Sequence, residues 1–165
     1  MSALLAGVEA PEINLAGIDG AKFSLRDVLK KGPVLAAFFK VSCPVCQMAF
    51  PYVERLFQAY GKQGKVTVVG VSQDNTADTR AFNREFGVTF PVLLDEKNYA
   101  VSRAYGLTNV PTLFLISPAG EIETTIVSWS KAEMEQLGRR LADINGIPET
   151  EIFRRGEKVA EFRPG

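Results

Sequence analysis

Continuous apolar runs alternate with turn-forming residues along the chain, and the longest of these runs predict buried β-strands. Residues 34–39 are apolar without a break, which is typical of a strand covered on both faces of a sheet. Residues 66–71 and 112–116 are similar, and Pro118-Ala119-Gly120 marks a tight turn into residues 121–127. The expected strands are residues 13–15, 22–24, 34–39, 66–71, 90–94, 112–116 and 121–127.

Apolar residues that recur every three or four positions predict the helices. Such a stripe follows Cys46 and stops before Gly61 and Gly64, which end the helix. Its members are Phe50, Val53, Leu56, Phe57 and Tyr60. Two more helices are expected with serine caps, at residues 24–29 and 130–144. The remaining helices are expected at residues 74–87 and 99–105.

This order of elements predicts an α/β fold. Crossover segments precede residues 66–71 and 90–94, which suits parallel strands, whereas the short turn before residues 121–127 suits an antiparallel hairpin. We therefore expect a mixed β-sheet flanked by helices on both faces, with an extra strand segment near the N-terminus.

The length of 165 residues predicts a single domain with a sizeable core, preceded by a lead-in at residues 1–9 and followed by a charged tail at residues 146–165. Nineteen basic residues balance nineteen acidic ones, and no basic stripe stands out, so a nucleic-acid-binding role is not expected. The oligomeric state is left open by the sequence.

Two further patterns bear on location. No apolar stretch approaches the length of a membrane span, so no membrane partner is expected. The N-terminal residues lack the basic start and long apolar core of a signal peptide. These residues predict a cytoplasmic protein, and an extracytoplasmic location stays open if a leader precedes them in the gene product.

The two cysteines of the chain are the strongest chemical signal. They form the motif Cys43-Pro44-Val45-Cys46, between the apolar run 34–39 and an expected helix. Two thiols at this spacing, between a strand and a helix, are typical of a dithiol redox site. The N-terminus of a helix stabilises a thiolate, and a second cysteine one turn later lies within reach for disulfide exchange.

Two other interpretations of the cysteine pair remain. A zinc site needs about four ligands, and this chain has no histidine and no third cysteine, so no metal or other cofactor is expected. The cysteines could also be inert core residues, because a free cysteine packs as a small hydrophobe.

These residues also carry a resemblance to a known group of proteins. The chain resembles the redoxin superfamily of thioredoxin-like fold, which includes the alkyl hydroperoxide reductase and thiol-specific antioxidant proteins, and is most similar to the TlpA-type thiol–disulfide oxidoreductases. The resemblance covers about residues 8–145. It rests on Ala10-Pro11-Glu12-Ile13-Asn14-Leu15 with Gly20 and Leu25, on Cys43-Pro44-Val45-Cys46, on Pro51, and on Val110-Pro111-Thr112 before Leu113-Phe114-Leu115-Ile116.

The resemblance implies a site and a division of roles. Cys43 would be the exposed nucleophile, Cys46 the resolving thiol, and Pro111 a cis proline packed opposite the sulfurs. The carbonyl and N–H of Val110 would then be free to pair with an extended substrate peptide. The substrate-binding residues implied in this way are Pro44, Val45, Val110 and Thr112. The implied partners are protein or small-molecule thiols and disulfides, with a thioredoxin-type or similar reductant.

The chain also departs from the family pattern. Ser42 stands where the family usually has tryptophan, and Ala37 stands where many members have a buried asparagine or aspartate that aids proton transfer. Lys40 could supply positive charge near Cys43, or it could be an ordinary solvated residue at a strand end.

Three functions remain as hypotheses. The first is a thiol–disulfide oxidoreductase. The second is a peroxiredoxin-like thiol peroxidase, although the family's proline and threonine or serine before the reactive cysteine are replaced here by Ala36 and Lys40. The third is a non-catalytic thioredoxin-fold module, such as a copper carrier or a thiol-regulated adaptor.

Overall fold

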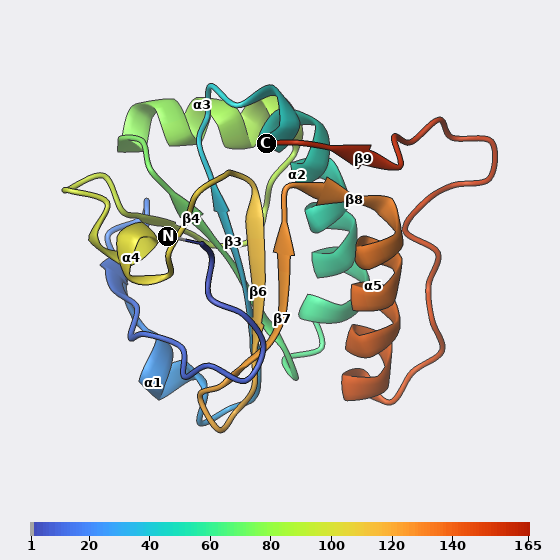
Figure 1. Cartoon of the computed structure of the whole chain (residues 1–165), viewed down its shortest axis with the longest axis horizontal. Coiled ribbons are helices and arrows are strands. Elements are labelled where there is room, and N and C mark those ends of the chain that lie inside the picture. Colours follow the sequence, from blue (N-terminus) through green and yellow to red (C-terminus); the bar gives the residue numbers. More distant parts are fainter. Residues whose placement is uncertain (1) are drawn as a thin grey trace.

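The centre of the computed structural model, which describes residues 2–165, is a five-stranded mixed sheet (Figure 1). Its strands lie in the order β5-β4-β3-β6-β7. The middle strand pairs in parallel with β4 and antiparallel with β6. These strands are β3 (Val34–Phe39), β4 (Thr67–Ser72), β5 (Val92–Leu94), β6 (Thr112–Ile116) and β7 (Ile122–Val127). The sheet is mixed, as the sequence predicts.

Side chains of β3 alternate between two hydrophobic clusters, one on each face of the sheet. Leu35, Ala37 and Phe39 belong to the cluster beneath α2 (Pro44–Leu56) and α5 (Lys131–Asn145). The intervening residues of β3 belong to the cluster on the other face, with α1 (Leu25–Val28) and α4 (Ala100–Ala104). All six residues of β3 are buried, because helices cover both faces of the strand (Figure 1). The predicted fold class is therefore confirmed.

The helix after the cysteines follows the predicted apolar stripe, with one change near its end. It is α-helical to Leu56, and a π-helical turn, η1 (Phe57–Gly61), completes it. The next helix, α3 (Thr76–Phe86), begins after Asn75, whose side chain accepts the N–H of Asp78 at 2.8 Å. It ends at Gly87 in the left-handed conformation, with a φ of 70°.

Several short strands complete the fold. A hairpin of β1 (Asn14–Ala16) and β2 (Lys22–Ser24) precedes α1. The expected strand at residues 90–94 is shorter than predicted, since β5 begins only after Pro91, which has no N–H for a sheet hydrogen bond. In the tail, β9 (Phe162–Arg163) pairs antiparallel with β8 (Trp129–Ser130), and the sequence pattern predicts neither of these strands.

The face of α2 that packs on the sheet carries aromatic side chains. Removing one of these rings should lower the free energy of unfolding considerably. Phe50 is fully buried, with its ring centroid 4.3 Å from that of Phe39 and 5.5 Å from that of Phe82. We expect Phe50→Ala to lower the free energy of unfolding by about 3–5 kcal/mol. Urea unfolding followed by far-UV circular dichroism measures this. Leu5→Ala, at an exposed residue, is the control, and equal losses in the two variants would contradict this packing.

Candidate active site

The sulfur of Cys43 lies at the N-terminus of α2, directly after the central strand and its connecting loop. Cys43 is the N-cap residue, and Pro44 occupies the first helical turn, where its missing N–H costs nothing. The N–H of Cys46 donates to Cys43 Sγ at 3.3 Å. The positive end of the helix therefore faces the sulfur and interacts favourably with the charge that it carries as a thiolate.

The two cysteines differ sharply in their surroundings, and both are free thiols. Cys43 is partly exposed, whereas Cys46 is 0 % exposed. Burial raises the pKa of Cys46, and the neighbouring Cys43 and the charge of Asp74 raise it further, against a backbone hydrogen bond from Lys40 that lowers it. The geometry therefore provides one accessible sulfur and one sheltered sulfur a single helical turn apart.

The Val110–Pro111 peptide bond is cis, as the resemblance implies, and it lies beside the first sulfur. The thiol of Cys43 donates to the carbonyl oxygen of Val110 at a distance of 3.4 Å between sulfur and oxygen. Thr112 is buried, and its hydroxyl donates to the carbonyl of Asn109 at 2.8 Å. These contacts hold the cis-proline loop, residues 109–112, against the start of α2.

The structure changes the expectation for Val110 in one respect. Its carbonyl is not free, because it accepts the thiol of Cys43 and is covered by Gly165. A Cβ atom added at Gly165 would overlap the carbonyl oxygen of Val110, so only a glycine fits there without a shift. The tail of the chain therefore lies on the surface that the resemblance assigns to substrate.

The remaining predicted site residues fall into two groups. Pro44 is exposed beside the accessible sulfur, whereas Val45 is 6 % exposed and packs in the core. Lys40 is exposed, and its carbonyl accepts the N–H of Cys43 at 3.2 Å. The idea that its side-chain charge lies near the sulfur stays a prediction.

Asp74 is a site residue that the sequence reasoning treats only as part of a helix start. Its carboxylate accepts the N–H of Val41 at 2.8 Å, and Gln47 donates its side-chain amide to the carbonyl of Val41 at 2.9 Å. Both contacts brace the loop that carries Cys43. A signal existed, because the carboxyl ends of the parallel strands β3 and β4 meet at one edge of the sheet, and Asp74 follows β4 as Cys43 follows β3.

Residues 2–165 offer neither a metal site nor a membrane span. None of these residues form a group of three or more histidine, cysteine or carboxylate side chains that could hold a metal ion. Within the same range, every helix is too short or too polar to cross a membrane.

Comparison with known proteins agrees with this geometry. The sequence pattern of the AhpC/TSA family matches residues 6–125. The thiol-disulfide oxidoreductase ResA of Geobacillus thermodenitrificans is 31% identical over 137 residues, which is 82% of this chain and 77% of that protein.

Solved structures share the fold. A putative thiol:disulfide interchange protein DsbE from Chlorobium tepidum has a TM-score of 0.75 and 29% identity, over 86% of this chain and 99% of that one. Peroxidoxin BcpB from Mycobacterium tuberculosis has a TM-score of 0.70 and 20% identity, over 88% of this chain and 99% of that one, which establishes a shared fold alone.

The unequal surroundings of the two sulfurs predict unequal alkylation. Cys43 should react faster with iodoacetamide near neutral pH than Cys46, because Cys46 is buried and its pKa is raised. Each unit by which a pKa is raised lowers the thiolate fraction about tenfold, so we expect a rate difference of at least about tenfold. Peptide mass mapping after brief labelling of the reduced protein measures both rates. Equal rates, or faster labelling of Cys46, would reverse the assignment of the accessible sulfur.

Proposed function

The chain belongs to the AhpC/TSA family and is a thiol–disulfide oxidoreductase, and on that premise we propose that Cys43 is its nucleophile and Cys46 its resolving thiol. One observation carries this assignment: Cys43 Sγ is the accessible sulfur, and it lies 3.3 Å from the N–H of Cys46 at the start of α2. The resolving thiol must be near but sheltered, and the fully buried Cys46 meets both conditions.

The reaction takes place in two exchanges. The thiolate of Cys43 attacks one sulfur of a substrate disulfide, the substrate S–S bond breaks, and the departing thiolate takes up a proton. The thiolate of Cys46 then attacks Cys43 Sγ, which releases the second substrate thiol and leaves a Cys43–Cys46 disulfide. The substrate gains two electrons and the protein loses two, and a dithiol reductant reverses the change in the protein.

The surroundings of the two sulfurs favour the thiolate of Cys43 more than the thiolate of Cys46. The helix N-terminus stabilises Cys43 as the thiolate that attacks the substrate disulfide, and again as the thiolate that leaves when a dithiol reductant resolves its own mixed disulfide with Cys43. The raised pKa of Cys46 keeps that sulfur protonated in the reduced protein. Only the thiolate of Cys46 attacks, so the second exchange should become faster as the pH rises.

The proposed substrate contacts follow from exposure. Pro44 is exposed beside Cys43 and contacts the substrate through its ring. Val45 is buried and packs in the core, so it supports the Cys43-Cys46 turn and does not reach the substrate directly. Val110 offers its backbone N–H to the substrate, whereas its carbonyl accepts the thiol of Cys43 and is covered by Gly165. Thr112 holds the cis-proline loop in place through Asn109. Partners of this site are protein or small-molecule disulfides, and a thioredoxin-type or similar dithiol supplies the electrons.

The peroxidase alternative needs more than a reactive sulfur. Peroxide reduction requires hydrogen-bond donors that polarise the O–O bond and stabilise the departing oxygen. The residue three positions before Cys43 is Lys40, which has no hydroxyl, and the hydrogen bonds of the Cys43 sulfur go to Cys46 and Val110. These partners favour disulfide exchange over peroxide reduction. A non-catalytic module would need neither an accessible sulfur nor a sheltered partner.

Two assays on one preparation test the proposed chemistry. We expect the protein to catalyse insulin reduction by dithiothreitol and to consume hydrogen peroxide slowly with a thioredoxin recycling system. Cys43→Ser should abolish insulin reduction, since the attacking sulfur is lost, and Ser42→Ala, at an exposed neighbour, is the control. Rapid, Cys43-dependent peroxide turnover without insulin reduction would favour the peroxidase. Silence in both assays, in the parent and in the variants, would favour the non-catalytic module.

We propose a cytoplasmic location for this protein, with an extracytoplasmic location as the alternative. Fractionation of cells that express the intact gene tests it. Recovery of the protein outside the cytoplasm would support the extracytoplasmic alternative.

A further inference from the structure

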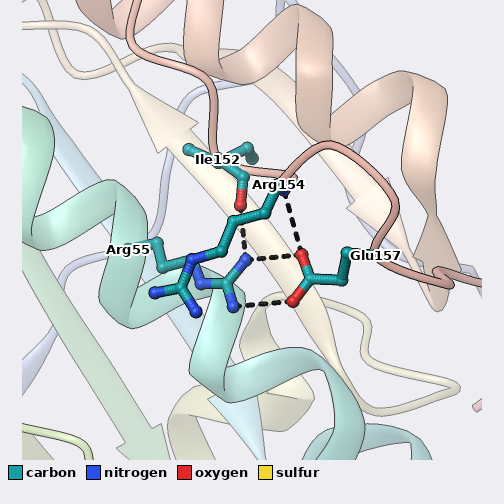
Figure 2. Close-up of polar contacts among 4 residues, drawn as sticks. All are labelled: Arg55, Ile152, Arg154 and Glu157. Carbon is teal, nitrogen blue, oxygen red and sulfur yellow. Dashed lines mark hydrogen bonds and ion pairs between the residues drawn. The ribbon is translucent and has the colours of Figure 1, made fainter.

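The tail of the chain is fastened to the active-site helix. Arg55 of α2 forms a bidentate ion pair with Glu157, at 2.7 and 2.8 Å. It also donates to the carbonyl of Ile152 at 2.7 Å (Figure 2). The N–H of Arg154 donates to the same carboxylate at 3.1 Å. Together, Arg55 and Arg154 lower the pKa of Glu157 to about 2, so the ion pair stays intact at neutral pH.

Beyond this anchor, the tail adds a strand to β8. Trp129 and Ser130 pair with Arg163 and Phe162 in β9. The indole N–H of Trp129 donates to the carbonyl of Ala160 at 2.6 Å. A strand edge is thus covered by a segment of the chain's own tail.

The last residues of the tail reach the cis-proline loop. The N–H of Gly165 donates to the hydroxyl of Ser128 at 3.0 Å, and Asn109 donates its side-chain amide to the carbonyl of Gly165 at 2.8 Å. Gly165 lies against the carbonyl of Val110, which itself accepts the thiol of Cys43. Figure 1 shows this end of the chain beside the start of α2. Val110 therefore lies between the end of the tail and the reactive sulfur of Cys43.

We propose that the edge of β8, together with Ser128 and Asn109, is the binding site for the extended backbone of a disulfide-bearing polypeptide, and that the tail at residues 160–165 occupies this site until such a substrate displaces it. The proposal rests on the function given above. A substrate chain that brings its sulfur to Cys43 must pass Val110, where Gly165 now lies. The backbone groups that hold the tail suit any extended chain, because main-chain hydrogen bonds do not depend on the side chains of the added strand.

The last residues of the tail are held weakly enough for a substrate chain to displace them. Residues 160–165 are exposed, and the side chain of Phe162 is 61 % exposed, so little apolar surface holds them in place. Ile152, on the other side of the anchor, is 5 % exposed and packs in the core. The final segment can therefore leave while the rest of the tail stays packed. The apparent affinity for substrate is then the intrinsic affinity multiplied by the fraction of molecules whose site is open, so it falls as that fraction falls.

The test compares a polypeptide disulfide with a small one in the full-length protein. Glu157→Gln weakens the anchor, and Gly165→Leu places a side chain where only a glycine fits. We expect both variants to show a several-fold lower KM for insulin, with an unchanged rate toward 5,5′-dithiobis(2-nitrobenzoate), which needs no backbone groove. Glu123→Gln is the matched control, because it breaks a similar two-pronged ion pair with Arg140 that does not involve the tail.

The single tryptophan reports the position of the tail independently of activity. Trp129 is buried and hydrogen-bonded to Ala160, so release of the tail should shift its emission to longer wavelength in both variants. S-carboxymethylated insulin B chain, which cannot undergo exchange, should cause a change in Trp129 emission on binding to the parent protein. It should bind several-fold more tightly to the two variants.

Several results would overturn the proposal. They are an unchanged Trp129 emission in both variants, an insulin KM that is unchanged or higher in them, and binding of the B chain without any change at Trp129. Failure of the proposed function looks different, since the parent protein would then react with neither insulin nor the small disulfide. Activity with both substrates, and variants that behave like Glu123→Gln, would reject the role of the tail alone.

Discussion

The position of one sulfur atom, between the first N–H groups of α2 and the carbonyl of Val110, determines how the rest of the site is arranged. Cys43 Sγ accepts from Cys46 at 3.3 Å and donates to Val110 at 3.4 Å. The first contact places the sulfur at the positive end of a helix, and the second keeps it at the cis-proline loop. The sulfur therefore lies where a helix terminus and a loop from a distant part of the sequence meet.

The sheet makes this meeting possible. The middle strand β3 leads into α2, and its antiparallel neighbour β6 begins at the last residue of the cis-proline loop, so both sides of the site adjoin neighbouring strands. The other neighbour, β4, leads to Asp74, which accepts the N–H of Val41 and braces the connecting loop. Because all three strands are largely buried, the site is supported by packed strands of the sheet, with the tail lying across it.

Much of this arrangement could be predicted from the sequence. The apolar run of β3 and the stripe of α2 are local patterns, and the cysteine pair between them identified the redox chemistry. The cis bond before Pro111 followed from a family resemblance, since sequence physics alone favours trans. The role of Asp74 and the path of the tail were missed. Both depend on contacts between distant residues, and the exposed, charged tail has no apolar period to show that it pairs with β8.

Trapping of the mixed-disulfide intermediate shows whether Cys43 attacks the substrate and Cys46 resolves it. The full-length Cys46→Ser variant is reduced, mixed with oxidised glutathione and examined by intact mass spectrometry with peptide mapping. We expect a stable glutathione adduct on Cys43 in this variant, and a Cys43–Cys46 disulfide without adduct in the parent protein. A Cys46→Ser variant that forms no adduct, together with a Cys43→Ser variant that accumulates one on Cys46, would contradict this assignment.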